Sequence, residues 1–122
     1  FFEVLEGYTQ MSYIDHNDNN HIQQILSKDS RTKINKQKIE TTTFNTIIEN
    51  KDINYLSIDT EGNEIDILKS IDYEKFNIKV ISVENNNSKD LKINEFLTKI
   101  NFNYFDNIGV DEIYYNKKFF SF

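Results

Sequence analysis

Asp59, Glu61 and Glu64 stand close together in the chain, directly after the apolar run 53–58. Carboxylates can hydrogen-bond a substrate hydroxyl, accept its proton or hold a cation. If the apolar run is a strand, Asp59 lies at its carboxyl end, where a helix begins. Ligands of open α/β sheets bind outside the carboxyl ends of the strands. The spacing therefore directs Asp59 and Glu61 towards the expected functional site.

A second polar group, Glu84 and Asn85, follows the apolar run 78–83. If the two apolar runs form neighbouring strands, these side chains lie at the same sheet edge as Asp59. One edge would then carry several oxygens that can bind a hydroxyl or a cation.

A structural interpretation of the same residues stays open beside the chemical one. Asp59 can cap the helix that follows it. Glu61 and Glu64 can stabilise the positive N-terminal end of that helix by about 0.3–1 kcal/mol each. Gly62 then only relieves crowding between strand and helix.

The elements that must position these residues follow from the spacing of apolar side chains. Before residue 42, the pattern predicts a strand at 2–5, a short helix at 21–26 and a strand at 38–41. The elements predicted after it are a helix capped by Thr42 or Thr43, a strand at 53–58, a helix to about Ser70, a strand at 78–83, a helix capped by Ser88, and strands at 103–107 and 112–115.

Strands that alternate with helices in this way predict an α/β fold with a mostly parallel sheet. The last two predicted strands have no helix between them, so we expect an antiparallel hairpin around Gly109 at the end of the sheet. The strand at 53–58 is rich in apolar residues on both faces, which is typical of a buried parallel strand.

Composition limits the partners of the chain. It has 122 residues and a net charge of −6, which argues against nucleic acid, because phosphate contacts need clustered Lys and Arg. No apolar run approaches the roughly 20 residues that cross a bilayer, so we expect no membrane partner. The chain has no Cys, which excludes disulfides and thiolate sites. This fits a reducing compartment, and we predict a cytoplasmic location.

Several segments resemble one known family. The segment 56–64, followed by Ile67, Leu68, Ile71 and Asp72, resembles the signature of FkbM-type methyltransferases. The further segments that are similar to parts of this family, in the family's order, are 6–12 with Asp15 and His16, then 41–48, 80–85 and 108–113.

The resemblance implies a Rossmann-like methyltransferase fold and S-adenosylmethionine as the methyl donor. It also implies a small molecule or glycan as acceptor, methylated on a hydroxyl of a sugar or secondary metabolite. For the complete protein, Asp59 is the first candidate for the catalytic base or hydroxyl anchor, and Glu61 and Glu84 are the second candidates. Asn85 and His16 are assigned to the substrate, although an exposed loop histidine is the alternative for His16.

No metal site is assigned. Some small-molecule O-methyltransferases place a divalent cation at this sheet edge, and Asp59, Glu84 and Asn85 could imitate its ligands.

One feature of the family has no counterpart in the chain. The family holds its cofactor with an acidic, glycine-rich turn after the first strand, where the backbone passes close to the ligand. Here glycine occurs only as Gly7, Gly62 and Gly109. We therefore interpret residues 1–122 as the C-terminal half of the domain, without the N-terminal cofactor-binding strands. We expect the cofactor site upstream of Phe1 and an inactive fragment.

A rival hypothesis is a non-catalytic half-domain that acts as a binding or interaction module. A half-sheet exposes apolar strand edges, so self-association through such an edge is expected. The terminal segment 119–122 is rich in Phe, and three interpretations stay open: a partner-binding tail, a segment that packs onto the sheet edge, or another arbitrary cut.

Overall fold

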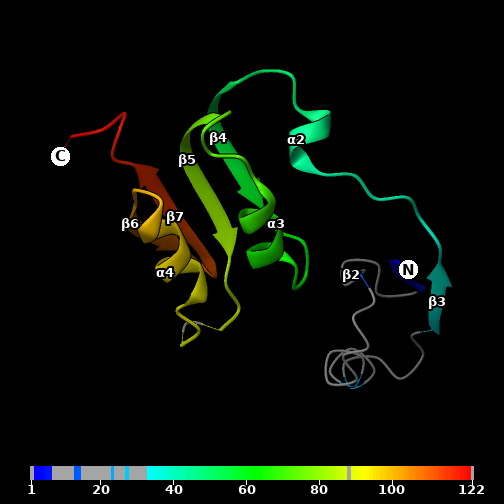
Figure 1. Ribbon diagram of the computed structural model, residues 1–122. Helices are drawn as coiled ribbons and strands as arrows, with labels where there is room; N and C mark the ends of the chain where they lie inside the picture. The colour runs from blue at the N-terminus through cyan, green and yellow to red at the C-terminus, as the bar shows by residue number, and fades with distance from the viewer. Residues whose placement is uncertain are drawn as a thin grey trace. The chain divides into compact units, whose positions relative to one another are not determined.

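The computed structural model of the chain describes residues 38–87 and 89–121 and, before them, the backbone of three strands and two single positions (Figure 1). The chain divides into two compact units, residues 1–41 with 61–63 and the remainder. Each unit has a β-sheet of its own.

The first unit contains a three-stranded sheet in the order β2-β1-β3. Its central strand β1 (Phe2–Glu6) pairs antiparallel with β2 (Tyr13–Ile14) and with β3 (Lys33–Gln37). The strand predicted at 2–5 is therefore confirmed.

Two other predictions for this part of the chain have different outcomes. The strand predicted at 38–41 is wrong, because the strand in this part of the chain spans Lys33–Gln37 and ends before residue 38. Its polar residues give no alternating pattern, and the strand is specified by its pairing with β1, from Phe2 opposite Gln37 onward. The helix predicted at 21–26 lies almost wholly outside the described residues.

The second unit contains a four-stranded sheet in the order β4-β5-β7-β6 (Figure 1). Its elements are α2 (Phe44–Ile47), β4 (Asp52–Ile58), α3 (Glu64–Ser70), β5 (Asn77–Glu84), α4 (Lys92–Lys99), β6 (Phe102–Ile108) and β7 (Asp111–Asn116). Strand β4 is parallel to β5, whereas the β5–β7 and β7–β6 pairs are antiparallel.

The α/β class is confirmed, but the prediction of a mostly parallel sheet is wrong, because this sheet is mixed and has a single parallel pair. The predicted hairpin around Gly109 does form, and its tight turn makes β6 and β7 antiparallel. Its second strand, β7, then lies between β5 and β6 and also runs against β5. The hairpin thus accounts for both antiparallel pairs.

Strand β4 also differs from the prediction. The apolar run predicts a strand buried on both faces, but β4 lies at the edge of the sheet, and Ile58 is its one buried residue. The side chain of Tyr55 is 59% exposed. Strand β5 has the expected buried character, since Ile78, Ile81 and Val83 are fully buried.

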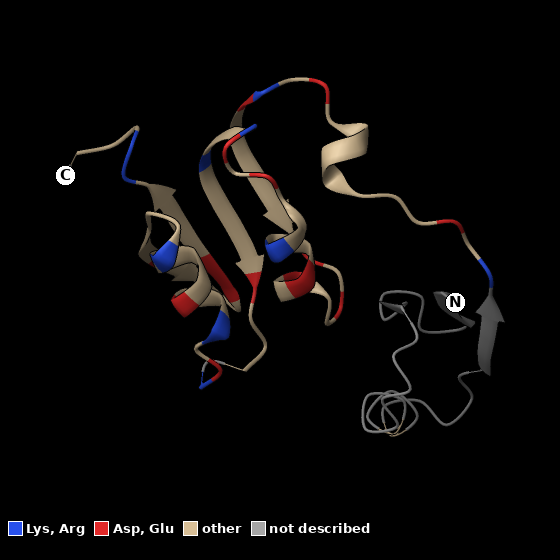
Figure 2. Cartoon of the chain, viewed as in Figure 1, with Lys and Arg blue, Asp and Glu red and all other residues tan. Residues whose placement is uncertain are grey.

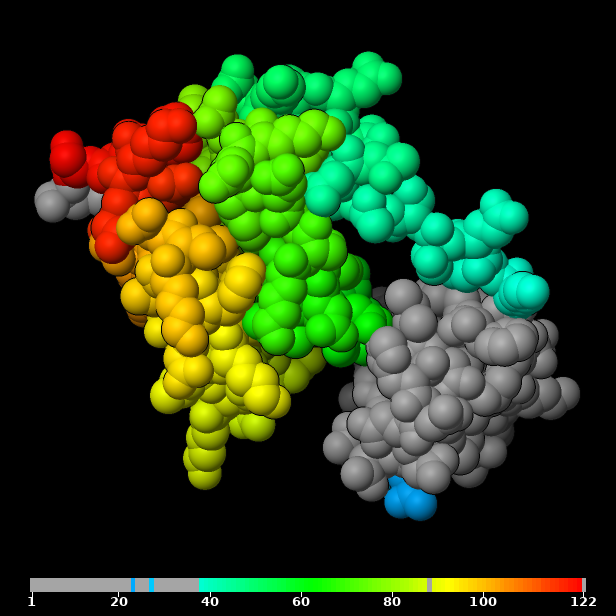
Figure 3. Space-filling model, viewed as in Figure 1, coloured from blue at the N-terminus to red at the C-terminus, as the bar shows by residue number. Residues whose placement is uncertain are grey.

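Helices α3 and α4 lie over one face of the sheet (Figure 1) and contact each other, and their green and orange atoms adjoin in the space-filling view (Figure 3). Their apolar positions match the predicted spacing, with Leu68 of α3 and Leu97 of α4 fully buried. The core of the second unit consists of Ile58, Leu68, Ile71, Phe76, Ile78, Ile81, Val83, Ile93, Leu97, Phe102 and Tyr114.

The helix ends show how local sequence competes with packing. Thr43 is the N-cap of α2, as predicted, although its hydroxyl bonds the Thr46 hydroxyl (2.9 Å) and not the helix backbone. Helix α4 begins at Lys92, later than the predicted cap at Ser88, which is outside the described residues. None of the helices in the described part of the chain has the length and apolarity to cross a bilayer.

The burial of Leu68 predicts a large loss of stability on truncation. Leu68→Ala should lower the free energy of unfolding of the second unit by about 2–5 kcal/mol, because it removes apolar contacts and leaves a cavity. The measurement is urea unfolding followed by circular dichroism. Leu91→Ala is the matched control, since Leu91 is 59% exposed, and its effect should stay within about 0.5 kcal/mol. Equal losses in the two variants would contradict the assigned core.

Candidate functional site

The parallel pairing of β4 with β5 brings the two predicted polar groups to one edge. Ile58 lies opposite Val83 in the register, so Asp59 follows β4 in line with Glu84 at the end of β5. The condition that the two strands are neighbours is thus met. Asp59 is exposed, whereas Glu84 is half-buried.

Acidic residues from a third strand extend this edge. Asp111 at the start of β7 lies opposite Glu84, and Glu112 lies opposite Val83. Figure 2 shows acidic residues at the carboxyl end of β5, at the adjacent start of β7 and in the turn after β4. We call this region, Asp59 with Glu84, Asn85 and Glu112, the acidic edge.

The turn after β4 is closed by the side chain of Glu64. Its Oε1 accepts hydrogen bonds from the backbone nitrogen (2.9 Å) and the hydroxyl (3.1 Å) of Thr60, and Glu64 is only 8% exposed. Within the turn, Glu61 has φ 55° and Gly62 has φ 113°. A positive φ at a residue with a side chain costs roughly 1–2 kcal/mol, so the Glu64 contacts help to hold a turn that local preference disfavours.

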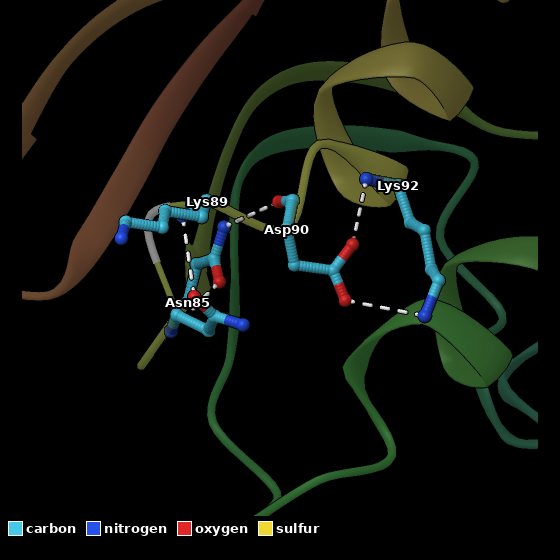
Figure 4. Close-up of polar contacts among 5 residues, drawn as sticks. Asn85, Lys89, Asp90 and Lys92 are labelled. Atoms are coloured by element: carbon cyan, nitrogen blue, oxygen red, sulfur yellow. Dashed lines mark hydrogen bonds and ion pairs between the residues drawn. The ribbon is translucent and has the colours of Figure 1, made fainter.

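Asn85 organises the loop that follows β5 (Figure 4). Its side-chain Nδ2 donates to the Asp90 carbonyl (3.2 Å) and to Glu112 Oε1 (2.9 Å), and its Oδ1 accepts from the Asn87 backbone nitrogen (3.2 Å). Its backbone nitrogen donates to the carbonyl of Val110 (3.0 Å). Both amide hydrogens therefore have partners within the chain, which gives Asn85 a structural role. Its role towards a substrate stays a prediction.

The same loop leads into α4 through Asp90. Its Oδ1 accepts from the Lys92 backbone nitrogen (3.1 Å), and its Oδ2 pairs with Lys92 Nζ (3.2 Å), as Figure 4 shows. The backbone hydrogen bond from Lys92 is the main reason why the pKa of Asp90 is held below its ordinary value. These contacts occupy the segment before Lys92, which explains why the helix begins later than predicted.

Two residues of the site were missed by the sequence analysis, Glu112 and Tyr114 of β7. Glu112 Oε2 accepts a hydrogen bond from the Tyr114 hydroxyl (2.5 Å), and Tyr114 is fully buried. Burial, and next the bond to Glu112, raises the pKa of the Tyr114 hydroxyl above its ordinary value of 10.0. The signal in the sequence was their spacing, since alternate residues of a strand lie on one face.

The remaining predicted residues have mixed outcomes. Glu61 lies in the turn after β4 and is half-buried, and its catalytic role stays a prediction. His16 lies outside the described residues. Within the described ranges, no three His, Cys, Asp or Glu side chains come together as a metal site.

An apolar pocket of about 200 Å³ is lined by Val80, Phe105, Ile113, Tyr115 and Phe120, none of which belongs to the acidic edge. Val80 and Tyr115 are paired across β5 and β7. They alternate with the core residues Ile81 and Tyr114, so the pocket lies on the sheet face opposite α3 and α4. The ring of Phe120 meets that of Tyr115 edge-on at 6.2 Å, so the terminal segment packs onto this face.

Comparison with protein families gives a match over most of the chain. The model of the methyltransferase FkbM domain matches residues 3–106, most of the chain. The chain belongs to the FkbM methyltransferase family. The family match includes Asp59 and Glu84 and ends before Glu112 and Tyr114. Comparisons with curated proteins and with solved structures give no significant match.

Methyltransferases generally use S-adenosylmethionine, and a site for it would need backbone that can approach the ligand and polar groups for its ribose and carboxylate. Gly62 and Gly109 are the only glycines in the described ranges, and each lies in a turn with a positive φ. A Cβ added at either would meet no atom of the chain within 4 Å, so the positive φ, and not close packing within the chain, accounts for glycine at these two positions. The pocket lined by Val80 offers no polar surface for a ribose or a carboxylate. The described residues do not form a cradle for the cofactor, and none is assigned to it.

The contacts of Glu64 predict a specific loss of stability. Glu64→Ala should lower the free energy of unfolding of the second unit by about 1–3 kcal/mol, since it removes two hydrogen bonds and leaves the part-buried Thr60 donors without this acceptor. Urea unfolding measures the change. Glu64→Gln keeps an oxygen acceptor and should recover most of the loss.

Asp66→Ala in the same first turn of α3 is the control, because Asp66 is exposed. Its effect should stay below about 1 kcal/mol, the size of a charge–helix-dipole contact. If Glu64→Ala costs no more than this control, the turn does not depend on Glu64.

Proposed function

We propose that this FkbM chain is part of an enzyme that transfers the methyl group of S-adenosylmethionine to a hydroxyl of a sugar or secondary metabolite. In this proposal the acceptor binds at the acidic edge. The observation that supports it is the register of the parallel pair β4–β5, which aligns Asp59 with Glu84 where α/β sheets bind their ligands.

The chemistry at the acceptor requires a group that takes a proton. Methyl transfer to a hydroxyl would form the oxygen–carbon bond as the carbon–sulfur bond of the donor breaks, with S-adenosylhomocysteine as the leaving group and the hydroxyl proton going to a nearby base. A carboxylate can first accept a hydrogen bond from the hydroxyl and then receive the proton. S-adenosylmethionine supplies the methyl group, and the residues of this chain orient the hydroxyl and remove its proton.

Asp59 is the best placed of the candidate bases. It is exposed, so an acceptor can reach it, and it follows a strand whose last residue, Ile58, is buried in the core. The contacts of Glu64 hold the turn directly after it. Glu84 is in line with Asp59 on the next strand and can hold a second hydroxyl of the acceptor, with Glu61 as a further candidate. A cytoplasmic location stays a prediction from the sequence.

The test is the loss of methyl transfer in a variant that keeps the shape of the site. Asp59→Asn should reduce turnover at least about 100-fold, the lower size of a general-base contribution, with little change in unfolding free energy. Turnover is measured in the complete protein as S-adenosylhomocysteine released with a panel of methyl glycosides.

Asp52→Asn is the matched control, because Asp52 is the first residue of β4, at the end of the strand opposite to Asp59. Its side chain accepts a hydrogen bond from Asn77 Nδ2 (2.9 Å), which the amide oxygen of Asn can also accept. Unchanged turnover in Asp59→Asn, or an equal loss in both variants, would sink the assignment of Asp59.

A second candidate function is a non-catalytic interaction module. The apolar pocket lined by Val80 and Phe105 favours it, because Phe105 is 62% exposed and exposed apolar surface is typical of protein contacts. Strands β4 and β6 are the edges of the sheet, so self-association through a strand edge belongs to this alternative.

Calorimetric titration of S-adenosylmethionine separates the two candidates. It is carried out on the chain and on a version extended upstream of Phe1. Binding to the extended version alone supports the enzyme and places the cofactor residues outside this chain. Binding to neither favours the interaction module, and binding to the chain alone means that residues within 1–122 hold the cofactor.

A further inference from the structure

We propose that Glu112 is a positioning residue, which ties the loop 85–90 to β7 and so fixes the acceptor side of the acidic edge. This inference rests on the proposed function. It assigns a role in that function to a residue that lies outside the family match, on a strand far from the signature segment 56–64 in the sequence.

The carboxylate of Glu112 joins two parts of the molecule. One oxygen, Oε1, accepts from Asn85 Nδ2 at 2.9 Å, and the other, Oε2, accepts from the Tyr114 hydroxyl at 2.5 Å. Each oxygen thus has its own donor, and hydrogen bonds to a charged acceptor are stronger than those between neutral groups.

Tyr114 anchors this contact in the core. Its side chain is fully buried, and its ring meets that of Tyr104 edge-on at 5.8 Å. In the register it lies opposite Ile81, which is also fully buried. Well-packed interiors leave such a ring little freedom to move. The hydroxyl of Tyr114 therefore holds Glu112 in a defined place.

Asn85 connects the fixed carboxylate of Glu112 to the loop through its side-chain hydrogen bonds. Besides Glu112, its side chain bonds the carbonyl of Asp90 and the backbone nitrogen of Asn87, so it spans the loop (Figure 4). Asn85 directly follows Glu84, which lies in line with Asp59. A shift of the Asn85 side chain would therefore change the loop beside the groups that face the acceptor.

The backbone contact between the loop and the hairpin does not depend on Glu112. The Asn85 nitrogen donates to the carbonyl of Val110 at 3.0 Å, and this bond remains when the Glu112 side chain is changed. Substitution of Glu112 should thus disturb the orientation of the loop and leave its attachment to the sheet intact. This separates positioning from folding.

Glu112→Gln is the test, because Gln has one acceptor oxygen where Glu has two. It can serve Asn85 or Tyr114 as acceptor, and the other donor loses its partner. Amide hydrogen exchange of residues 85–90 should become roughly tenfold faster, as expected for the loss of one such bond. Asp111→Asn is the matched control, since it removes the same charge one position away, on the other face of β7, and should leave this exchange unchanged.

A rescue variant strengthens the test. Asn85→Asp alone places two carboxylates together and should speed the exchange further. In the double variant Asn85→Asp with Glu112→Gln, the amide introduced at position 112 can donate to the new carboxylate while its oxygen accepts from Tyr114. Exchange slower than in Asn85→Asp alone is expected. Additive effects of the two substitutions would overturn the contact between these side chains.

The second readout is kinetic and distinguishes positioning from a merely structural role. With S-adenosylmethionine and the methyl glycoside that the unsubstituted complete protein uses best, Glu112→Gln should raise KM for the glycoside about tenfold and leave KM for S-adenosylmethionine unchanged. Faster exchange with unaltered glycoside kinetics would overturn the positioning role. Absence of turnover in the unsubstituted protein would contradict the proposed function. The exchange and rescue results would still show whether Glu112 contacts Asn85, because they do not depend on turnover.

Discussion

The mixed pairing of β5 is the constraint on which the second unit depends. Its parallel pairing with β4 aligns Asp59 with Glu84, and its antiparallel pairing with β7 brings Glu112 to the same edge. Side chains of β5 are buried on both faces, so the backbone that carries the edge cannot shift without moving the packed interior. The polar groups of the acidic edge are thus carried by rigid elements.

Local patterns in the sequence were sufficient for the elements of the second unit and for the first half of the candidate site. The apolar runs 53–58 and 78–83 end in polar residues, and both became strands of nearly the predicted length. Their parallel neighbourhood, which the prediction required, is confirmed. Helical spacing also identified the buried sides of α3 and α4, because a helix in contact with a sheet must turn its apolar stripe towards it.

Contacts between distant segments could not be predicted in this way. Strand β3 is polar, and its pairing with β1 specifies it. Strand β7 lies between β5 and its hairpin partner β6, so it is β7 and not β6 that pairs with β5. No local pattern specifies that order, which is why the alternation of strands and helices predicts a mostly parallel sheet. Glu112 was missed for the same reason, since its significance lies in Asn85, which is far away in the chain.

The place of β7 also determines when the sheet can be completed during synthesis. Strand β5 emerges from the ribosome well before residues 111–116, so one of its backbone edges has no strand beside it until the last hairpin has been made. Hairpins form rapidly because their contacts are local, whereas pairing between distant strands is slow. The hairpin of β6 and β7 is therefore a natural late unit of folding. A nascent or truncated chain that lacks it would present the β5 edge to other chains as a template for aggregation.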